Sequence, residues 1–244
     1  MKISLLFPPT WHPSQPYLSL PSLTGFLAQG GVTNVSQRDL GIELLDRVVT
    51  HSYGVALYQE LVDKQRTLEQ ERIGDTGPGS TEHLARVVES LDRFPYLIDR
   101  IEPAKETLRG EGFYDLESYK ESLFLIDKWL EVLSTLYFPT RLTVVDNQFG
   151  SCSIYSSKDL MKIIKDEAQN PYIRLFQEQF VQSIVGEQPD LIGVSITATS
   201  QIIPGLTLCR LLKEAAPNIH LTIGGSIFTR LVDNVRRCPS LFDL

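Results

Sequence analysis

The chain has 244 residues, of which 42% are hydrophobic and 22% charged, and it carries a formal net charge of −7. This length and composition are typical of a globular protein with one large domain or two small ones. The negative balance and the lack of a Lys and Arg cluster argue against a nucleic-acid partner, because phosphate binding needs grouped cations.

The cysteines and the N-terminus indicate a cytoplasmic protein. Cys152, Cys209 and Cys238 are far apart and lack metal-ligand spacing, which favours reduced thiols over a zinc site or a disulfide framework. The opening segment KISLLF lacks the charged flank and cleavage site of a signal peptide, and no apolar run approaches membrane-spanning length. We therefore expect no membrane partner.

The first 50 residues have the pattern of a β-α-β unit. Residues 3–7 form an apolar strand candidate that Pro8 and Pro9 end. The segment LPSLTGFLAQGG predicts a helix that stops at its two glycines, and TNVSQRDL predicts a second strand that ends at Asp39.

The same pattern returns near the C-terminus. It predicts a strand over 191–196, a helix over 204–216, a strand over 220–225 and a helix over 229–237. Apolar strands that alternate with helices are typical of a parallel sheet covered on both faces. We therefore predict an α/β fold with a Rossmann-like, doubly wound parallel sheet of order 2-1-3-4.

The middle of the chain predicts a large all-helical insertion. Apolar residues of TEHLARVVESL recur at helical spacing, Asp115 is placed as the N-cap of the helix that follows it, and two further helices begin near Ser157 and Pro171. GDTGPGS, residues 74–80, has the composition of a flexible linker. The expected domains are 1–50 with 188–244 for the sheet, and 51–187 for the insertion.

Polar residues gather where the third predicted strand ends. The run DLIGVSITATSQIIPG starts as a buried strand and then supplies five hydroxyl or amide side chains, Ser195, Thr197, Thr199, Ser200 and Gln201. In an open parallel sheet, ligands bind at the carboxyl ends of the strands where the strand order reverses. The pattern predicts a ligand crevice there, and Gly224 and Gly225 end the next strand either as a plain turn or as bare backbone under a ligand.

Four segments together resemble a known family. FPPTWHPSQPYLSLPSLTGFLAQGG, RDLGIELLD, PDLIGVSITATSQIIPGL and TIGGSIFTRL are similar, in this order, to the N-terminal cobalamin-binding-type domain of B12-dependent radical SAM proteins, including those of peptide maturation. The resemblance covers about 50 residues at each end of the chain and leaves the middle unassigned.

The resemblance implies cobalamin as the cofactor. The nucleotide tail of cobalamin would lie beside Ser195 and Thr197 and against Gly224 and Gly225, and the corrin would rest on the loops after the first and third strands. The site residues so implied are Pro9, Thr10, Trp11, His12, Ser195, Thr197, Thr199, Ser200, Gly224, Gly225 and Ser226. We expect a cobalamin-binding part of a methyltransferase or peptide-modifying enzyme that is not catalytically complete alone.

Two departures from the family limit this expectation. The D-x-H-x-x-G motif that supplies a lower cobalt ligand is replaced by TWHPSQ, so His12 is either a cobalt ligand or an ordinary loop histidine. The C-x-x-x-C-x-x-C motif is missing, so this chain cannot hold the [4Fe-4S] cluster that cleaves S-adenosylmethionine. We expect both groups, and the catalytic radical SAM domain, in a part outside this chain.

Several alternatives stay open at the sequence level. The fold can have lost its cofactor and instead dock a peptide substrate or a partner protein through its amphipathic helices. Trp11 and Tyr17 either contact a planar ligand or pack locally, and Asp39 suits a ligand hydroxyl. Asp146 and the two residues after it fit a turn better than a site. No G-x-G-x-x-G motif supports a dinucleotide, and the two prolines after the first strand disfavour a response regulator.

Overall fold

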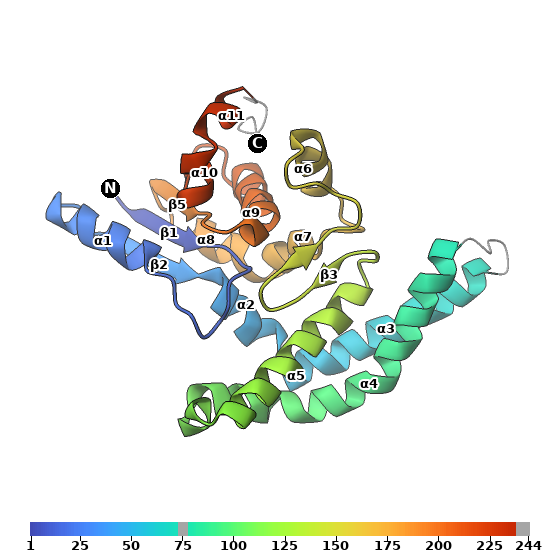
Figure 1. The fold of residues 1–244 in the computed structure, drawn as a ribbon. Coiled ribbons are helices and arrows are strands. Elements are labelled where there is room, and N and C mark those ends of the chain that lie inside the picture. The colour runs from blue at the N-terminus through green and yellow to red at the C-terminus, as the bar shows by residue number, and fades with distance from the viewer. Residues whose placement is uncertain (73–77, 238–244) are drawn as a thin grey trace. The chain divides into compact units, whose positions relative to one another are not determined.

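Four parallel strands form the central sheet in the order β2-β1-β5-β6 (Figure 1). The computed structural model describes residues 1–72 and 78–237. The strands are β1 (Ile3–Phe7), β2 (Val35–Asp39), β5 (Leu191–Ser195) and β6 (His220–Gly224), and each stops within one residue of its predicted C-terminal end. The α/β class and the parallel sheet are thus confirmed.

Alternation along the strands assigns the two faces of the sheet. Ile3, Leu5 and Phe7 of β1 point to one face, where they form a buried cluster with Leu20 of α1 (Ser19–Gln29). The other face packs against α9 (Ile202–Ala215), where Gly205 lies so close to Ile196 that a Cβ would stand 2.4 Å from its Cδ1 atom. Burial on both sides explains the continuous apolar pattern of β1.

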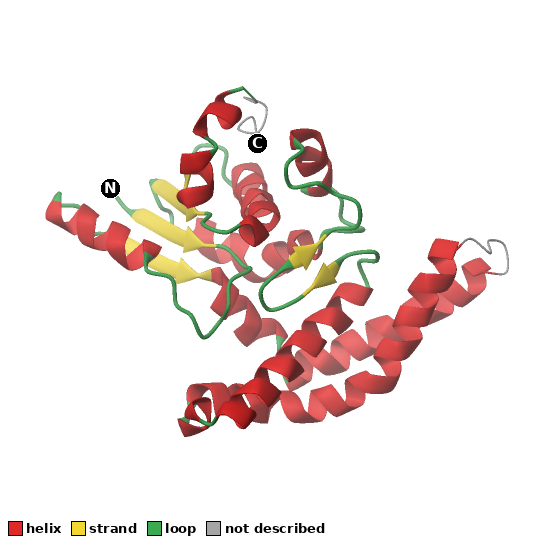
Figure 2. Cartoon of the chain, in the orientation of Figure 1, coloured by secondary structure: helices red, strands yellow, loops and turns green. Residues whose placement is uncertain are grey.

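The predicted helices around the sheet are present with small shifts. α1 stops before Gly30 as expected, and the last predicted helix is divided into α10 (Ser226–Arg230) and α11 (Val232–Arg236). Figure 2 shows the helices of this part of the chain, in red, beside the yellow strands of the sheet. The other elements of this part of the chain are α2 (Leu40–Val48), α6 (Ser157–Ile163), α7 (Pro171–Phe176), the π-helical η2 (Gln177–Val181), α8 (Gln182–Gly186) and the 3-10 helix η3 (Thr199–Gln201).

The chain divides into two compact units, Met1–Leu44 with Ser151–Leu244, and Leu45–Gly150. The predicted boundaries differ chiefly in residues 151–187, which join the sheet instead of the insertion. One contact that joins these residues to the sheet is polar and buried: Asn170, the N-cap of α7, donates to the Thr207 hydroxyl of α9 at 2.9 Å and to the Ile163 carbonyl at 3.1 Å. Asn170 and Thr207 are both fully buried, so these bonds tie α7 to the sheet's own helix.

The second unit is built on three long helices, α3 (His51–Arg72), α4 (Pro78–Arg109) and α5 (Leu116–Thr135), with a short 3-10 helix η1 (Glu111–Tyr114). Trp129 is fully buried at their centre and contacts Phe94 edge-on at 4.8 Å between ring centroids. Gly54 of α3 admits this indole, because a Cβ there would lie 2.4 Å from the ring. Asp115 caps α5 as predicted, accepting from the Ser118 amide.

The insertion was expected to be all-helical, but it also contains two short strands. β3 (Arg141–Leu142) and β4 (Asn147–Gln148) pair antiparallel, and the Asp127 carboxylate accepts the Val144 amide between them at 2.9 Å. Asp146 lies in the connecting turn, as the turn interpretation held, but Asn147 and Gln148, which it also assigned to the turn, form β4 because they pair with β3. Of the predicted linker, residues 74–77 lie outside the described residues, and Pro78 begins α4. None of the helices described is long and apolar enough to span a membrane.

Candidate functional site

The loops that follow β1 and β5 are held together by one buried amide, that of Gln201. Its side chain is fully buried and donates from Nε2 to the Pro8 carbonyl at 2.7 Å. Its Oε1 accepts from the backbone N–H groups of Thr197 and Ala198, at 2.9 and 3.1 Å, and from the Thr197 hydroxyl at 3.0 Å. Gln201 therefore sets the separation of the two strand ends where a ligand crevice was predicted.

The hydroxyls of the site contact the chain's own loops. Ser200 donates to the Thr10 carbonyl at 3.1 Å, and Ser226 donates to the Thr197 carbonyl at 3.0 Å. The Thr10 hydroxyl lies 2.9 Å from the phenol oxygen of buried Tyr172 in α7. These predicted site residues do come together, but they join the ends of β1, β5 and β6 to one another. Thr199, by contrast, is exposed.

The two glycines after β6 have different roles. Gly225 has a φ of +109°, and a Cβ there would stand 2.1 Å from the Ile196 carbonyl oxygen, so a side chain collides with the backbone. Close packing within the chain is therefore enough to require Gly225. Gly224 has an ordinary φ, and a Cβ at this position would meet nothing within 4 Å. Of these two glycines, only Gly224 faces open space.

A buried hydroxyl lies next to this open position. Ser195 and Gly224 are register partners in β5 and β6, so their side-chain positions share one face of the sheet. Ser195 is 5% exposed, so its hydroxyl is nearly buried next to the open position of Gly224. A nearly buried hydroxyl beside an empty position is the feature of this site that suits a ligand atom.

Trp11 and Tyr17 pack locally, as one of the two interpretations held. Both rings contact Phe7 of β1, with Tyr17 stacked on it at 5.5 Å and Trp11 edge-on at 6.1 Å between centroids. Trp11 also lies 5.0 Å from Tyr17 and donates its indole N–H to the Gln15 carbonyl. The three rings close the end of β1 on the α1 face.

His12 is held by its own loop. Its Nδ1 accepts the Ser14 amide at 3.3 Å and lies 2.9 Å from the Ser14 hydroxyl, while partial burial lowers the pKa of the imidazole. A neutral ring whose Nδ1 accepts an N–H carries its proton on Nε2. Metal-ligating histidines instead donate the second N–H to an oxygen, so this arrangement does not prepare Nε2 to bind cobalt.

Asp39, which was predicted to suit a ligand hydroxyl, caps a helix. Its carboxylate accepts the backbone N–H groups of Gly41 and Ile42, at 3.0 and 3.1 Å, in the first turn of α2. Burial raises the pKa of the Asp39 carboxyl, and the two hydrogen bonds oppose that shift. The side chain is therefore occupied by the chain itself.

The cysteines and other metal-binding residue types form no site in the described part of the chain. Within residues 1–72 and 78–237, no three His, Cys, Asp or Glu side chains lie together as a metal site would need. Burial raises the pKa of the Cys209 thiol to about 12, and burial also raises that of Cys152, so both thiols are protonated at neutral pH. Cys238 lies outside the described residues.

Sequence reasoning missed two residues of the site. Gln201 was noticed as polar but was not assigned a role, although an amide directly before the apolar run IIPG is a signal of a buried polar contact. Tyr172 was assigned to the insertion, and only the three-dimensional structure brings its hydroxyl to Thr10. Comparison with protein-family models, curated proteins and solved structures found no match to this chain.

The Gln201 contacts predict a large cost for an apolar replacement. Gln201→Leu leaves the buried Pro8 carbonyl and two partly buried amides without this partner, so we expect the free energy of unfolding to fall by about 2 kcal/mol. Urea denaturation followed by circular dichroism measures this change. Gln182→Leu is the matched control, because Gln182 is an exposed residue of α8, and it should change stability by less than about 0.5 kcal/mol. Equal effects of the two substitutions would contradict the assignment.

The Asp39 cap predicts opposite outcomes for two substitutions. Asp39→Ala removes the acceptor and should cost about 1 kcal/mol at pH 7, whereas Asp39→Asn keeps it. Because the folded-state pKa is raised, the folded chain binds the proton more tightly, and stability is lost as the pH rises through that pKa. Asp39→Asn should therefore match or exceed the wild type at pH 7 and lose any advantage below pH 4, in urea titrations at both pH values. An Asn variant as unstable as the Ala variant at pH 7 would exclude this role.

Proposed function

We propose that the sheet is Rossmann-like and doubly wound, with Leu45–Gly150 inserted, and that its carboxyl end binds cobalamin as part of a cytoplasmic radical SAM enzyme. The order β2-β1-β5-β6 supports the predicted order 2-1-3-4, in which the strand order reverses between β1 and β5. Ligands of such sheets bind at that reversal. The loops joined by Gln201 are the loops at this point.

The observation that carries the proposal is the open position at Gly224 beside the nearly buried Ser195 hydroxyl. A cofactor as large as cobalamin needs a stretch of backbone without side chains, together with a few polar groups that fix its orientation. Gly224 provides the first, and Ser195 provides a donor and an acceptor. The nucleotide tail is the part of cobalamin that fits this position, with the corrin amides toward exposed Thr199.

In this proposal the residues of this chain bind cobalamin and orient it. Bound cobalamin supplies a carrier for a methyl group or assists radical chemistry, which proceeds where S-adenosylmethionine and a [4Fe-4S] cluster are held by another part of the enzyme. Gln201 keeps the two loops apart at a fixed distance, and Trp11 with Tyr17 closes the crevice on one side. His12 takes no part in bonding cobalt, because its Nδ1 accepts the Ser14 amide.

The rival is a module of the same fold that docks a peptide or a partner protein without a cofactor. The specific observation in its favour is that the hydroxyls of Thr197, Ser200 and Ser226 donate hydrogen bonds to acceptors within the chain. Hydroxyls engaged in this way stabilise loops whether or not a ligand is bound. The two candidates therefore differ at Ser195 and Gly224.

The test is a titration of the purified chain with hydroxocobalamin, followed by gel filtration and the visible spectrum. We expect retention near one equivalent, and Gly224→Leu should weaken it at least tenfold because the side chain fills the open position. Gly186→Leu is the matched control, since that glycine on α8 is also open, and it should bind as the wild type does. His12→Ala should leave the spectrum of the bound cofactor unchanged.

Two results would overturn the cobalamin proposal. One is a folded wild-type chain that retains no cobalamin after gel filtration. The other is retention by Gly224→Leu equal to that of the wild type, which would separate binding from the open position. Either result favours the docking module.

A further inference from the structure

A groove with a cavity of about 610 Å³ runs between α4 and α5 in the second compact unit. This volume lies within the range of ligand-binding cavities in proteins. Every residue that lines the groove belongs to the unit Leu45–Gly150. The inference drawn from it is therefore independent of the cobalamin site on the sheet.

The floor of the groove is apolar or already hydrogen-bonded. Ser90 and Thr135 are buried, and their hydroxyl oxygens lie 3.0 Å apart across the two helices. Thr135 and Ser134 also donate to the Glu131 carbonyl, at 3.1 and 2.7 Å. With these hydroxyls occupied, and with Leu97 also lining it, the floor suits an apolar side chain of a ligand.

The rim of the groove is positively charged in a chain that is negative as a whole. Four cations and two carboxylates line it, so the lining carries a formal charge of +2, against −7 for the chain. The cations are Arg86, Arg93, Lys128 and Arg141, and the carboxylates are Glu89 and Glu131. A ligand with carboxylates complements this rim. The two glutamates disfavour a polyanion such as a nucleic acid.

The rim cations on α4 can exchange partners at small cost. Arg93 pairs with Glu89 at 2.8 Å and Arg86 with Glu82 at 2.8 Å, each one helical turn away. The side chains of the first pair are 63% and 58% exposed. Exposed pairs of this spacing contribute roughly 0.3–0.5 kcal/mol, so a carboxylate from a partner can replace Glu89 at Arg93. Arg86 is 34% exposed and also lies over the Phe138 ring at 5.0 Å, so a carboxylate that replaces Glu82 meets a guanidinium held by that ring.

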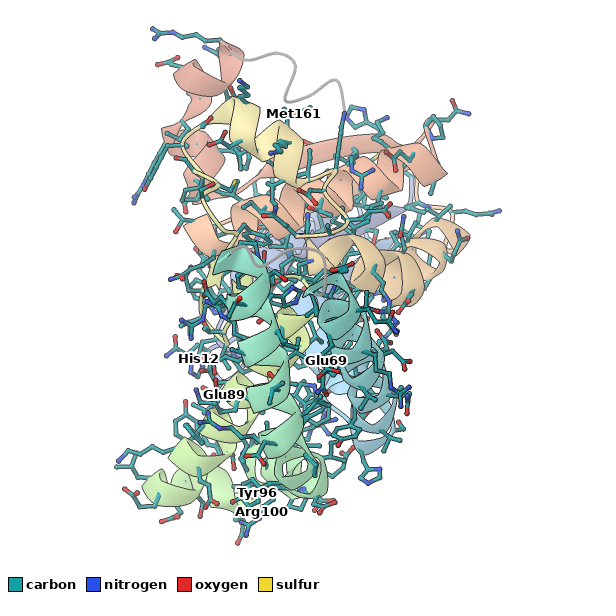
Figure 3. All side chains as sticks on the ribbon, turned by 90° about the vertical axis from the view of Figure 1, so that its right-hand side faces the viewer. His12, Glu69, Glu89, Tyr96, Arg100 and Met161 are labelled. Atoms are coloured by element: carbon teal, nitrogen blue, oxygen red, sulfur yellow. The ribbon has the colours of Figure 1, made fainter. Side chains whose placement is uncertain are left out.

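Two exposed aromatic rings also line the groove, as is common at protein-binding surfaces. Tyr96 is 54% and Phe124 58% exposed, and both line the groove. Arg100 lies over the Tyr96 ring at 5.0 Å and Lys128 over the Phe124 ring at 5.5 Å. Figure 3 shows Glu89, Tyr96 and Arg100 in this order along α4. Tyr, Phe and Arg are the residue types enriched where proteins bind one another.

We propose that this groove docks an acidic peptide segment, with its carboxylates on Arg86 and Arg93 and an apolar side chain on the floor. Arg86 and Arg93 are seven residues apart on α4, about 10 Å along the helix axis. In a peptide with the polyproline II conformation, which has three residues per turn and rises about 3.1 Å per residue, carboxylates three positions apart lie on one face at about this distance. The occupant is therefore a peptide with two acidic residues three positions apart and an apolar residue between them.

The experiment selects ligands from a phage-displayed library of random 12-residue peptides, with the full chain as bait. Enriched peptides should carry Asp or Glu three positions apart around an apolar residue and should be poor in Lys and Arg. The strongest binder is then labelled with fluorescein and titrated by fluorescence anisotropy, beside a twin in which each acidic residue is replaced by its amide.

Charge reversal in the groove gives the decisive comparison. Arg86→Glu with Arg93→Glu should weaken binding of the labelled peptide at least tenfold, and the amide twin should bind the wild type equally poorly. Arg66→Glu on α3 is the matched control, because Arg66 is also exposed and also pairs within its helix, with Asp63. That variant should bind within twofold of the wild type. Circular dichroism and hydroxocobalamin retention should not change in either variant.

Three results would overturn the proposal. They are the recovery of no binding peptide, the enrichment of basic peptides, and binding that survives the double charge reversal. None of them bears on cobalamin retention, which is measured on the same preparations and depends on the other compact unit.

Discussion

The buried side-chain amide of Gln201 is the contact on which the sheet's carboxyl end depends. It donates to the Pro8 carbonyl after β1 and accepts two amides after β5, so one side chain satisfies backbone groups of two loops that are 193 residues apart in sequence. Backbone groups at the ends of buried strands need such partners, because unpaired N–H and C=O groups inside a protein are costly. Ser200 and Ser226 extend the same network to Thr10 and to the start of α10.

This network limits where a ligand can bind. The hydroxyls of Thr197 and Ser226 already donate to groups of the chain itself. Gly225 is required because a side chain there would collide with the Ile196 backbone. What remains is the neighbouring pair of Ser195 and Gly224, one a nearly buried hydroxyl and the other a backbone position with empty space above it. The rigid network on one side and the open pair on the other are the two properties that a preorganised binding site requires.

The strands and most helices could be predicted from sequence because their signals are local. Apolar runs predicted β1, β5 and β6, of which β1 is ended by proline, β5 by hydroxyl side chains and β6 by glycine. Asp115 was predicted as the N-cap of the helix after it. The site could be predicted only in part, since a hydroxyl at a strand end has the same sequence signal whether it binds a ligand, as proposed for Ser195, or a neighbouring loop, as Ser200 does. The roles of Gln201 and Tyr172 depend on contacts between segments far apart in the chain, and the groove between α4 and α5 depends on side chains of two separate helices. Helical periodicity predicts each helix but not the surface that two helices form together.

The measurement that tests the central role of Gln201 most directly is amide hydrogen exchange of the wild-type chain, resolved by residue. The amides of Thr197 and Ala198 lie in a loop, where exchange is ordinarily fast, yet both donate to the buried Gln201 oxygen. The account predicts protection at these two amides comparable to that of β5, and additional protection around Gly224 when hydroxocobalamin is added. Rapid exchange at Thr197 and Ala198 in the native chain would contradict it, because the loops would then not be held by the amide.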